Sequence, residues 1–128
     1  MSNESKSAPN VIGTWVGKTN DAVIGGGNHY PNGEKGEVRF MGLEVTYQFD
    51  KQSNRAFSGE FTISGHTVQI VGSFNSDLVS GTMADKDGTY TFKMTGPDIM
   101  SVSFASTTTD RYNRSAGPVA DCHDIVRK

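Results

Sequence analysis

The sequence predicts an all-β protein, an antiparallel up-and-down β-barrel of eight strands. Apolar residues recur at every second position through most of the chain, which is typical of strands with one buried face. No segment has a helical period, and short turn signals join most of the expected strands, as in a meander. An open meander would expose two strand edges, and closure removes both, so we expect a closed barrel.

The first two strands differ from the others in the loop between them. The first strand is expected over residues 11–19. Residues 20–36 are rich in Gly, Asn and Pro, and this composition predicts a long loop. The second strand is expected over 37–49. Its apolar alternation changes phase near Gly42, which predicts a bulge or a sharp bend at that point.

The rest of the chain continues the meander. Six more strands are expected over 57–63, 68–74, 78–84, 90–94, 100–104 and 119–127. Turn signals such as Asp85-Lys86-Asp87-Gly88 separate most of them, but residues 107–118 predict a second long loop. Successive connections of a meander lie at opposite ends of the barrel. Both long loops are therefore expected at one end, the mouth, and Trp15 and both termini at the other, the closed end.

Composition narrows the partners and the location. Residues 1–10 are polar and predict a disordered tail, which leaves 11–128 as a single barrel domain. A net charge of −2 with no basic stripe predicts neither a nucleic-acid nor a membrane partner. The only cysteine, Cys122, cannot form an intrachain disulfide, and there is no signal-peptide pattern. We expect a cytoplasmic protein, with a processed exported form as the alternative. A homo-oligomer is a further alternative to a monomer.

Two features near the ends of the chain resemble a known barrel motif. Gly13-Thr14-Trp15 opens the first strand and Arg127 nearly ends the last. They are similar to the Gly-x-Trp motif and the arginine of the calycins, which include the lipocalins and the avidins. The resemblance implies that Arg127 packs across the Trp15 indole and closes one end, a cation–π contact of about 1 kcal/mol. Uncharacterised prokaryotic barrel proteins resemble the chain in the same way.

The last strand carries the candidate polar residues of the interior. If Arg127 points inward, a period of two places Ile125, His123 and Asp121 inward as well. The opposite parity would instead bury Cys122, Asp124 and Val126. A buried histidine beside a carboxylate suits a general base or a ligand anchor. It equally suits a hydrogen-bonded structural residue in the barrel wall.

We therefore expect a barrel that binds a small, mostly apolar or amphipathic molecule carrying a polar or anionic group. The expected ligand-binding side chains are Tyr47, Phe61, Tyr90, Phe92, Phe104, Asp121 and His123. The expected rim of the mouth consists of His29, Tyr30, His66, Arg111, Tyr112 and Arg114. The histidines and the cysteine lack metal-ligand spacing, so neither a metal nor a cofactor is expected.

Other functions and a solid interior stay open at this point. A cofactor-free cyclase or isomerase could use the same cavity, working by shaping and dehydrating its substrate. A protein-binding, inhibitor-like barrel is a further alternative. Gly59, Gly72 and Gly81 lie near the middle of three consecutive strands. They predict either strand curvature or open space inside the barrel.

Overall fold

Every regular element of the described chain is a β-strand. The structure is a computed structural model and describes residues 7–25, 34, 36–106 and 116–128. The strands are β1 (Gly13–Lys18), β2 (Asp21–Gly25), β3 (Val38–Met41), β4 (Glu44–Ser53), β5 (Ala56–Ile63), β6 (His66–Phe74), β7 (Ser80–Asp85), β8 (Gly88–Gly96), β9 (Ile99–Ser106) and β10 (Ala116–Arg127). This part of the chain contains no helix long and apolar enough to cross a membrane.

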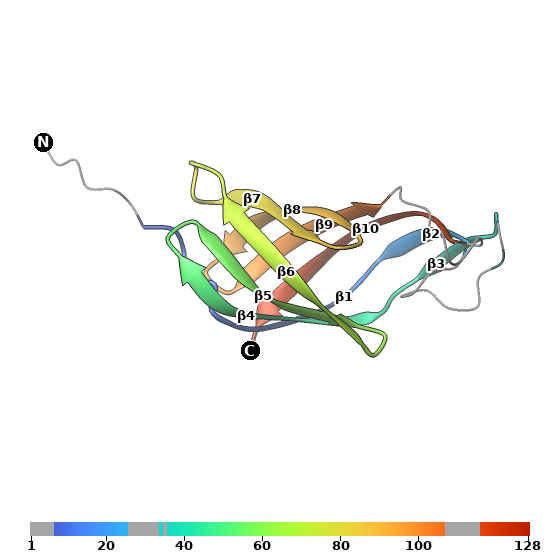
Figure 1. The fold of residues 1–128 in the computed structure, drawn as a ribbon, viewed down its shortest axis with the longest axis horizontal. Helices are drawn as coiled ribbons and strands as arrows, with labels where there is room; N and C mark the ends of the chain where they lie inside the picture. Colours follow the sequence, from blue (N-terminus) through green and yellow to red (C-terminus); the bar gives the residue numbers. More distant parts are fainter. Residues whose placement is uncertain (1–6, 26–33, 35, 107–115) are drawn as a thin grey trace, which may run out of the picture.

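The ten segments form the eight strands of a closed antiparallel barrel (Figure 1), which confirms the predicted fold class. β1 and β2 are two parts of one barrel strand, which bends at Thr19 and Asn20. β3 and β4 are likewise two parts of the next strand, which bends at Gly42 and Leu43. The predicted change of phase near Gly42 is correct and corresponds to this second bend.

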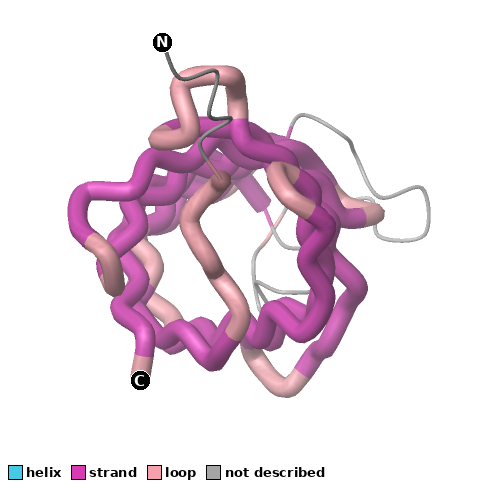
Figure 2. The backbone as a smooth tube through the Cα atoms, turned by 90° about the vertical axis from the view of Figure 1, so that its left-hand side faces the viewer, coloured by secondary structure: helices cyan, strands magenta, loops and turns pink. Residues whose placement is uncertain are grey.

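β10 closes the barrel because it pairs on both of its edges. One edge pairs with β9, and the other pairs with β2 and then with β1. In this register Trp15 lies opposite Arg127, and Asp21 lies opposite Asp121. Figure 2 looks at the barrel from one end and shows the strands as a ring.

The predicted loop over residues 20–36 is wrong at its start, because Asp21–Gly25 forms β2. In β2 the side chains of Asp21 and Val23 are buried, and those of Ala22 and Ile24 are exposed. The buried position at Asp21 is polar, so the strand lacks the apolar alternation by which the others were predicted. Tertiary pairing with β3 and β10 makes it a strand.

The predicted loop over residues 107–118 is too long at its end. β10 already begins at Ala116 and so includes Pro118. Proline cannot donate a backbone hydrogen bond and is therefore confined to edges and irregular positions of a sheet. Here the register shifts between Ala116 and Val119, and Pro118 lies in this irregularity. Residues 107–115 lie outside the described residues.

The core contains two aromatic groups. The closed-end aromatic group consists of Phe49, Phe57, Phe74 and Phe92, and the mouth-side aromatic group consists of Tyr47, Phe61, Tyr90 and Phe104. The rings of Tyr47 and Phe49, with centroids 5.9 Å apart, join the two groups. Phe104 is half-buried, and every other member of both groups is buried.

Rings occupy the space beside two of the mid-strand glycines. Phe57 lies opposite Gly72 and Phe92 lies opposite Gly81 in the sheet register. A Cβ at Gly72 would lie 2.3 Å from Phe57 Cζ, and one at Gly81 would lie 2.7 Å from Phe92 Cε1. At Gly59 a Cβ would lie 1.9 Å from a backbone oxygen. The closed half of the barrel is therefore packed at these glycines.

Trp15 and Arg127 form the contact expected from the sequence. Trp15 has no exposed surface, and its Nε1 donates a hydrogen bond to the Val11 carbonyl at 2.9 Å. The Arg127 guanidinium carbon lies 4.6 Å from the centre of the indole. The guanidinium also donates to the carbonyls of Asn10, Ile12 and Pro97 and to the carboxylate of Asp98. Arg127 thus links the last strand to two other segments at this end.

The segment before β1 also covers the closed end. Val11 is completely buried, and its N–H donates to Gln52 Oε1 at 2.9 Å. Gln52 Nε2 in turn donates to the Pro9 carbonyl at 2.8 Å. Figure 2 shows this segment running across the end of the ring. Residues 8–10 of the expected tail therefore contact the barrel, while 1–6 lie outside the described residues.

Candidate functional site

A cluster of polar side chains lies inside the barrel on the mouth side of Trp15. The last strand has the parity expected if Arg127 points inward: Asp121, His123 and Ile125 are buried, and the residues between them are exposed. Thr19 at the bend between β1 and β2 and Asp21 at the start of β2 are buried as well. Tyr47 of β4 completes the cluster.

A hydrogen-bonded chain connects three of these residues. Asp121 Oδ2 lies 2.5 Å from His123 Nδ1, and His123 Nε2 lies 3.0 Å from the Tyr47 hydroxyl. The other oxygen of Asp121 accepts the Asn20 N–H at 2.7 Å. In the tautomer that carries its proton on Nδ1, His123 donates to the Asp121 carboxylate, and the Tyr47 hydroxyl donates to Nε2.

A second pair of residues holds the bend of the first barrel strand. The Thr19 hydroxyl donates to Asp21 Oδ2 and accepts the Leu43 N–H at 2.8 Å, so it connects the two bends. Asp21 lies directly opposite Asp121, and both residues are buried, 3% and 5% exposed. Directly opposite residues on one face of an antiparallel pair are neighbours, so this half of the interior is polar and acidic.

The mouth-side aromatic group surrounds Tyr47, the last residue of the hydrogen-bonded series Asp121–His123–Tyr47. The Tyr47 ring lies 4.7 Å from that of Phe61 and 6.5 Å from that of Tyr90, measured between centroids. The rings of Tyr90 and Phe104 are 4.6 Å apart. The Tyr90 hydroxyl donates to Asp85 at 2.5 Å, at the turn between β7 and β8. Polar and aromatic surfaces thus adjoin in this half of the barrel.

Six of the seven predicted ligand-binding residues come together, and Phe92 is separate. Its ring contacts those of Phe57 and Phe74, at 5.7 Å and 5.1 Å, in the closed-end aromatic group. Sequence parity correctly places Phe92 inside the barrel, but parity does not give its height along the barrel axis. Height depends on strand tilt and register, which are properties of the whole sheet.

Most of the predicted rim lies outside the described residues: His29, Tyr30, Arg111, Tyr112 and Arg114. His66 is described and is exposed at the start of β6. The described residues that flank the two loops meet at one end of the barrel. Gly25 lies opposite Ala116, and Val119 lies opposite Ser106. This is the mouth end of β10, whereas Arg127 and Trp15 lie at its other end.

Thr19 and Asp21 are the interior polar residues that the sequence reasoning missed. The signal that could have found them is the run Asp21-Ala22-Val23-Ile24, which alternates in period two once a polar inward position is allowed. Among the described residues, no group of three or more His, Cys, Asp or Glu side chains is placed to hold a metal ion.

Comparison with known proteins supports the fold and gives no family. No family model matches the chain, and no curated protein matches it. A solved structure of EF1p2_mFAP2b bound to DFHBI is similar to it, with a TM-score of 0.58 and 12% sequence identity. The similarity covers 92% of this chain and 94% of that one. The fold and the site define a closed eight-stranded antiparallel barrel with a buried polar chain in one half.

Proposed function

We propose that this protein binds a small, mostly apolar molecule in the mouth half of its barrel. The observation that carries the proposal is the chain from Asp121 through His123 to Tyr47, which ends in a phenol among aromatic rings. Binding sites of this kind combine an apolar wall with a few convergent polar groups. The similar fold of EF1p2_mFAP2b, whose structure is bound to DFHBI, adds support, as does the calycin resemblance of Trp15 and Arg127.

The polar group of the ligand would lie beside the Tyr47 end of the hydrogen-bonded series, and the rings of Phe61 and Phe104 would contact its apolar body. The arginines expected to bind an anionic group, Arg111 and Arg114, lie outside the described residues.

A cofactor-free isomerase or cyclase is the second candidate, and the same hydrogen-bonded residues, Asp121, His123 and Tyr47, favour it. In such a reaction the Tyr47 oxygen would take a proton from the bound molecule while Tyr47 passes its own proton to His123 Nε2. Return of the proton to another atom of the molecule would complete the isomerisation. Asp121 would stabilise the imidazolium that forms. Recovery of the bound molecule in a changed form after incubation would separate this enzyme from a binder.

Native mass spectrometry of the purified protein tests the binding proposal. We expect an additional non-covalent mass that disappears on denaturation. Tyr47→Phe should reduce its occupancy, because the hydroxyl is lost and the ring is kept. Tyr90→Phe is the matched control, because it removes a phenolic hydroxyl of the same aromatic group that donates to Asp85. His123 is less suitable, because its loss would remove one of the two partners of the buried Asp121 carboxylate and destabilise the fold.

DFHBI provides a direct probe of the same site. We expect saturable shifts in the NMR spectrum at the backbone amides of Tyr47 and His123 when DFHBI is added. Shifts confined to the outer face of the sheet would contradict a site inside the barrel. The absence of both a co-purified mass and a DFHBI response would refute the binding proposal.

A further inference from the structure

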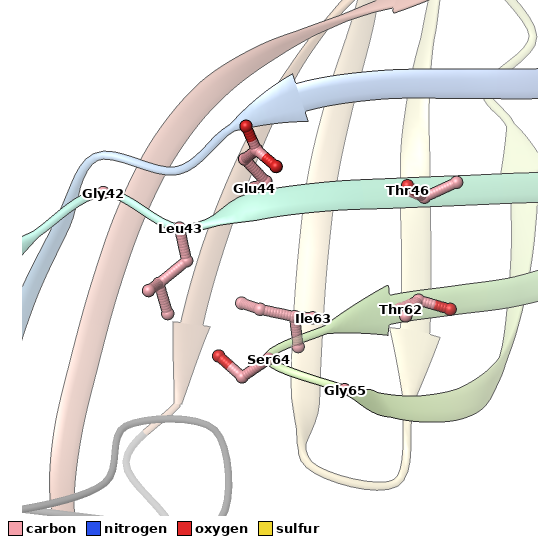
Figure 3. A pocket seen from close by; sticks show the side chains of 8 residues that line it. All are labelled: Gly42, Leu43, Glu44, Thr46, Thr62, Ile63, Ser64 and Gly65. Carbon is pink, nitrogen blue, oxygen red and sulfur yellow. The ribbon is translucent and has the colours of Figure 1, made fainter.

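A pocket lies at the side of the barrel where two neighbouring strands part. β5 pairs with β4 only as far as Ile63 opposite Val45. Beyond this pair β5 turns into β6, while the other strand bends into β3 and follows β2. A pocket of about 450 Å³ lies there (Figure 3) and is lined by Gly42, Leu43, Glu44, Thr46, Thr62, Ile63, Ser64 and Gly65. Its volume is in the range of small-molecule sites.

The inner wall of this pocket consists of core side chains. Ile63 is 2% exposed and belongs to the hydrophobic core, and Leu43 is half-buried and packs against that core. Figure 3 shows the side chains of Leu43, Ile63 and Ser64 pointing toward one another. Every other lining residue that is not glycine carries a hydroxyl or a carboxylate and is exposed or half-buried. The pocket therefore has a polar rim and an apolar floor.

The apolar floor adjoins the proposed binding site. On the inner face of the barrel, Leu43 is followed by Val45 and Tyr47 of β4, and Ile63 is preceded by Phe61 of β5. Residues two positions apart in a strand are separated by about 7 Å. Phe61 is one such step from the floor and Tyr47 is two, and their ring centroids are 4.7 Å apart. The pocket thus lies next to the rings that the proposed ligand contacts.

The backbone of Leu43 is fixed, but its side chain is not enclosed. The Leu43 N–H donates to Thr19 Oγ1, and its carbonyl accepts the Thr19 N–H, both at 2.8 Å. The Leu43 side chain is half-buried, whereas Ile63 beside it has almost no exposed surface. A partly exposed leucine can change rotamer on a fast timescale without moving its backbone. Leu43 is therefore the side chain between pocket and core that is able to move.

We propose that this pocket is the entrance through which a ligand reaches the interior, and that the Leu43 side chain is its gate. Rotation of Leu43 away from Ile63 would let a molecule pass into the mouth half of the barrel with no backbone hydrogen bond broken. The proposal rests on the proposed function, because an entrance needs a site behind it. A gate lies on the path and not at its end, so it changes association and dissociation by the same factor and leaves Kd unchanged.

Surface plasmon resonance with immobilised protein and DFHBI tests the gate, because it measures both rate constants. We expect Leu43→Ala to raise the association and dissociation rate constants together by roughly three- to tenfold, with Kd changed less than about twofold. Met94→Ala is the matched control. Met94 is also half-buried and packs against the core, but it lies opposite Met100 towards the closed end, so both rate constants should stay unchanged. Circular dichroism checks that each variant is folded.

A bulky group attached at the rim should have the opposite effect. In a Cys122→Ser background, Ser64→Cys carries the only thiol of the chain, and N-phenylmaleimide then places a ring in the pocket. We expect this label to slow association and dissociation together. Ser73→Cys is the matched control, because Ser73 is exposed on β6 towards the closed end. Each labelled protein is compared with its own unlabelled form, so an effect of the substitution on the fold cancels.

Rate constants that neither Leu43→Ala nor the label at Ser64→Cys changes would overturn the gate and leave binding itself standing. Equal slowing by the label at Ser73→Cys would overturn it too. A changed Kd with an unchanged association rate constant would also overturn it, because Leu43 would then belong to the wall that holds the ligand. If DFHBI does not bind, native mass spectrometry follows release of the co-purified molecule from the same variants. A protein that holds neither molecule refutes the binding proposal and the gate with it.

Discussion

Replacement of Trp15 by alanine is expected to lower the free energy of unfolding by about 3–5 kcal/mol, the range for a large buried aromatic. Trp15 has no exposed surface, so the substitution removes an indole that is in full contact with the core. It also removes the hydrogen bond from Nε1 to the Val11 carbonyl, 2.9 Å long. At roughly 0.05–0.15 kcal/mol per residue, the 128-residue chain has a total stability of about 6–19 kcal/mol. The loss of about 3–5 kcal/mol should lower the melting temperature by roughly 10–25 °C.

A double-mutant cycle isolates the contact with Arg127. The guanidinium lies 4.6 Å from the indole centre, and its hydrogen bonds go to other groups. Comparing Trp15→Ala, Arg127→Ala and the double variant should give a coupling of about 0.5–2 kcal/mol. Urea unfolding followed by far-UV circular dichroism is the assay, because Trp15 is the only tryptophan and its fluorescence is lost.

Val126→Ala is the control for this cycle. Val126 neighbours Arg127 in sequence but is 47% exposed, so its truncation should change stability by less than about 0.5 kcal/mol. A loss below about 1 kcal/mol for Trp15→Ala, or a coupling of zero, would refute the view that this pair holds the closed end together.

Two further perturbations test the packing and the turns. Gly72→Ala should cost about 1–3 kcal/mol in chemical unfolding, because the new Cβ would lie 2.3 Å from Phe57 Cζ; Gly96→Ala, with nothing within 4 Å, should be close to neutral. The backbone N–H groups of Ser80 and Val79 lower the pKa of Asp77 from 3.8 to about 2. The stability that Asp77 contributes is therefore present above pH 3.8 and lost as pH falls towards 2, so the difference from Asp77→Ala should shrink over that interval. A difference that stays constant down to pH 2 would contradict this assignment.

Local alternation in the sequence determined most of the barrel. Period-two alternation located strands β4 to β9. With the calycin resemblance turning Arg127 inward, it also put Asp121, His123 and Ile125 on the inner face, because successive side chains of a strand point to opposite faces. Turn signals such as Asp85-Lys86-Asp87-Gly88 located hairpins, and the change of phase at Gly42 located a bend. Each of these signals depends on residues close together in the chain, so one sequence is enough to show them.

The contacts between strands needed the tertiary structure. The hydrogen bond between His123 and Tyr47 joins residues 76 positions apart, and Asp21 lies opposite Asp121. Such neighbours depend on sheet register and strand tilt, which the closure of the whole barrel decides. For the same reason Phe92, which faces inward as expected, packs in the closed half. β2 became a strand only because β3 and β10 pair with it, and the polar inward side chain of Asp21 concealed that pairing from the sequence.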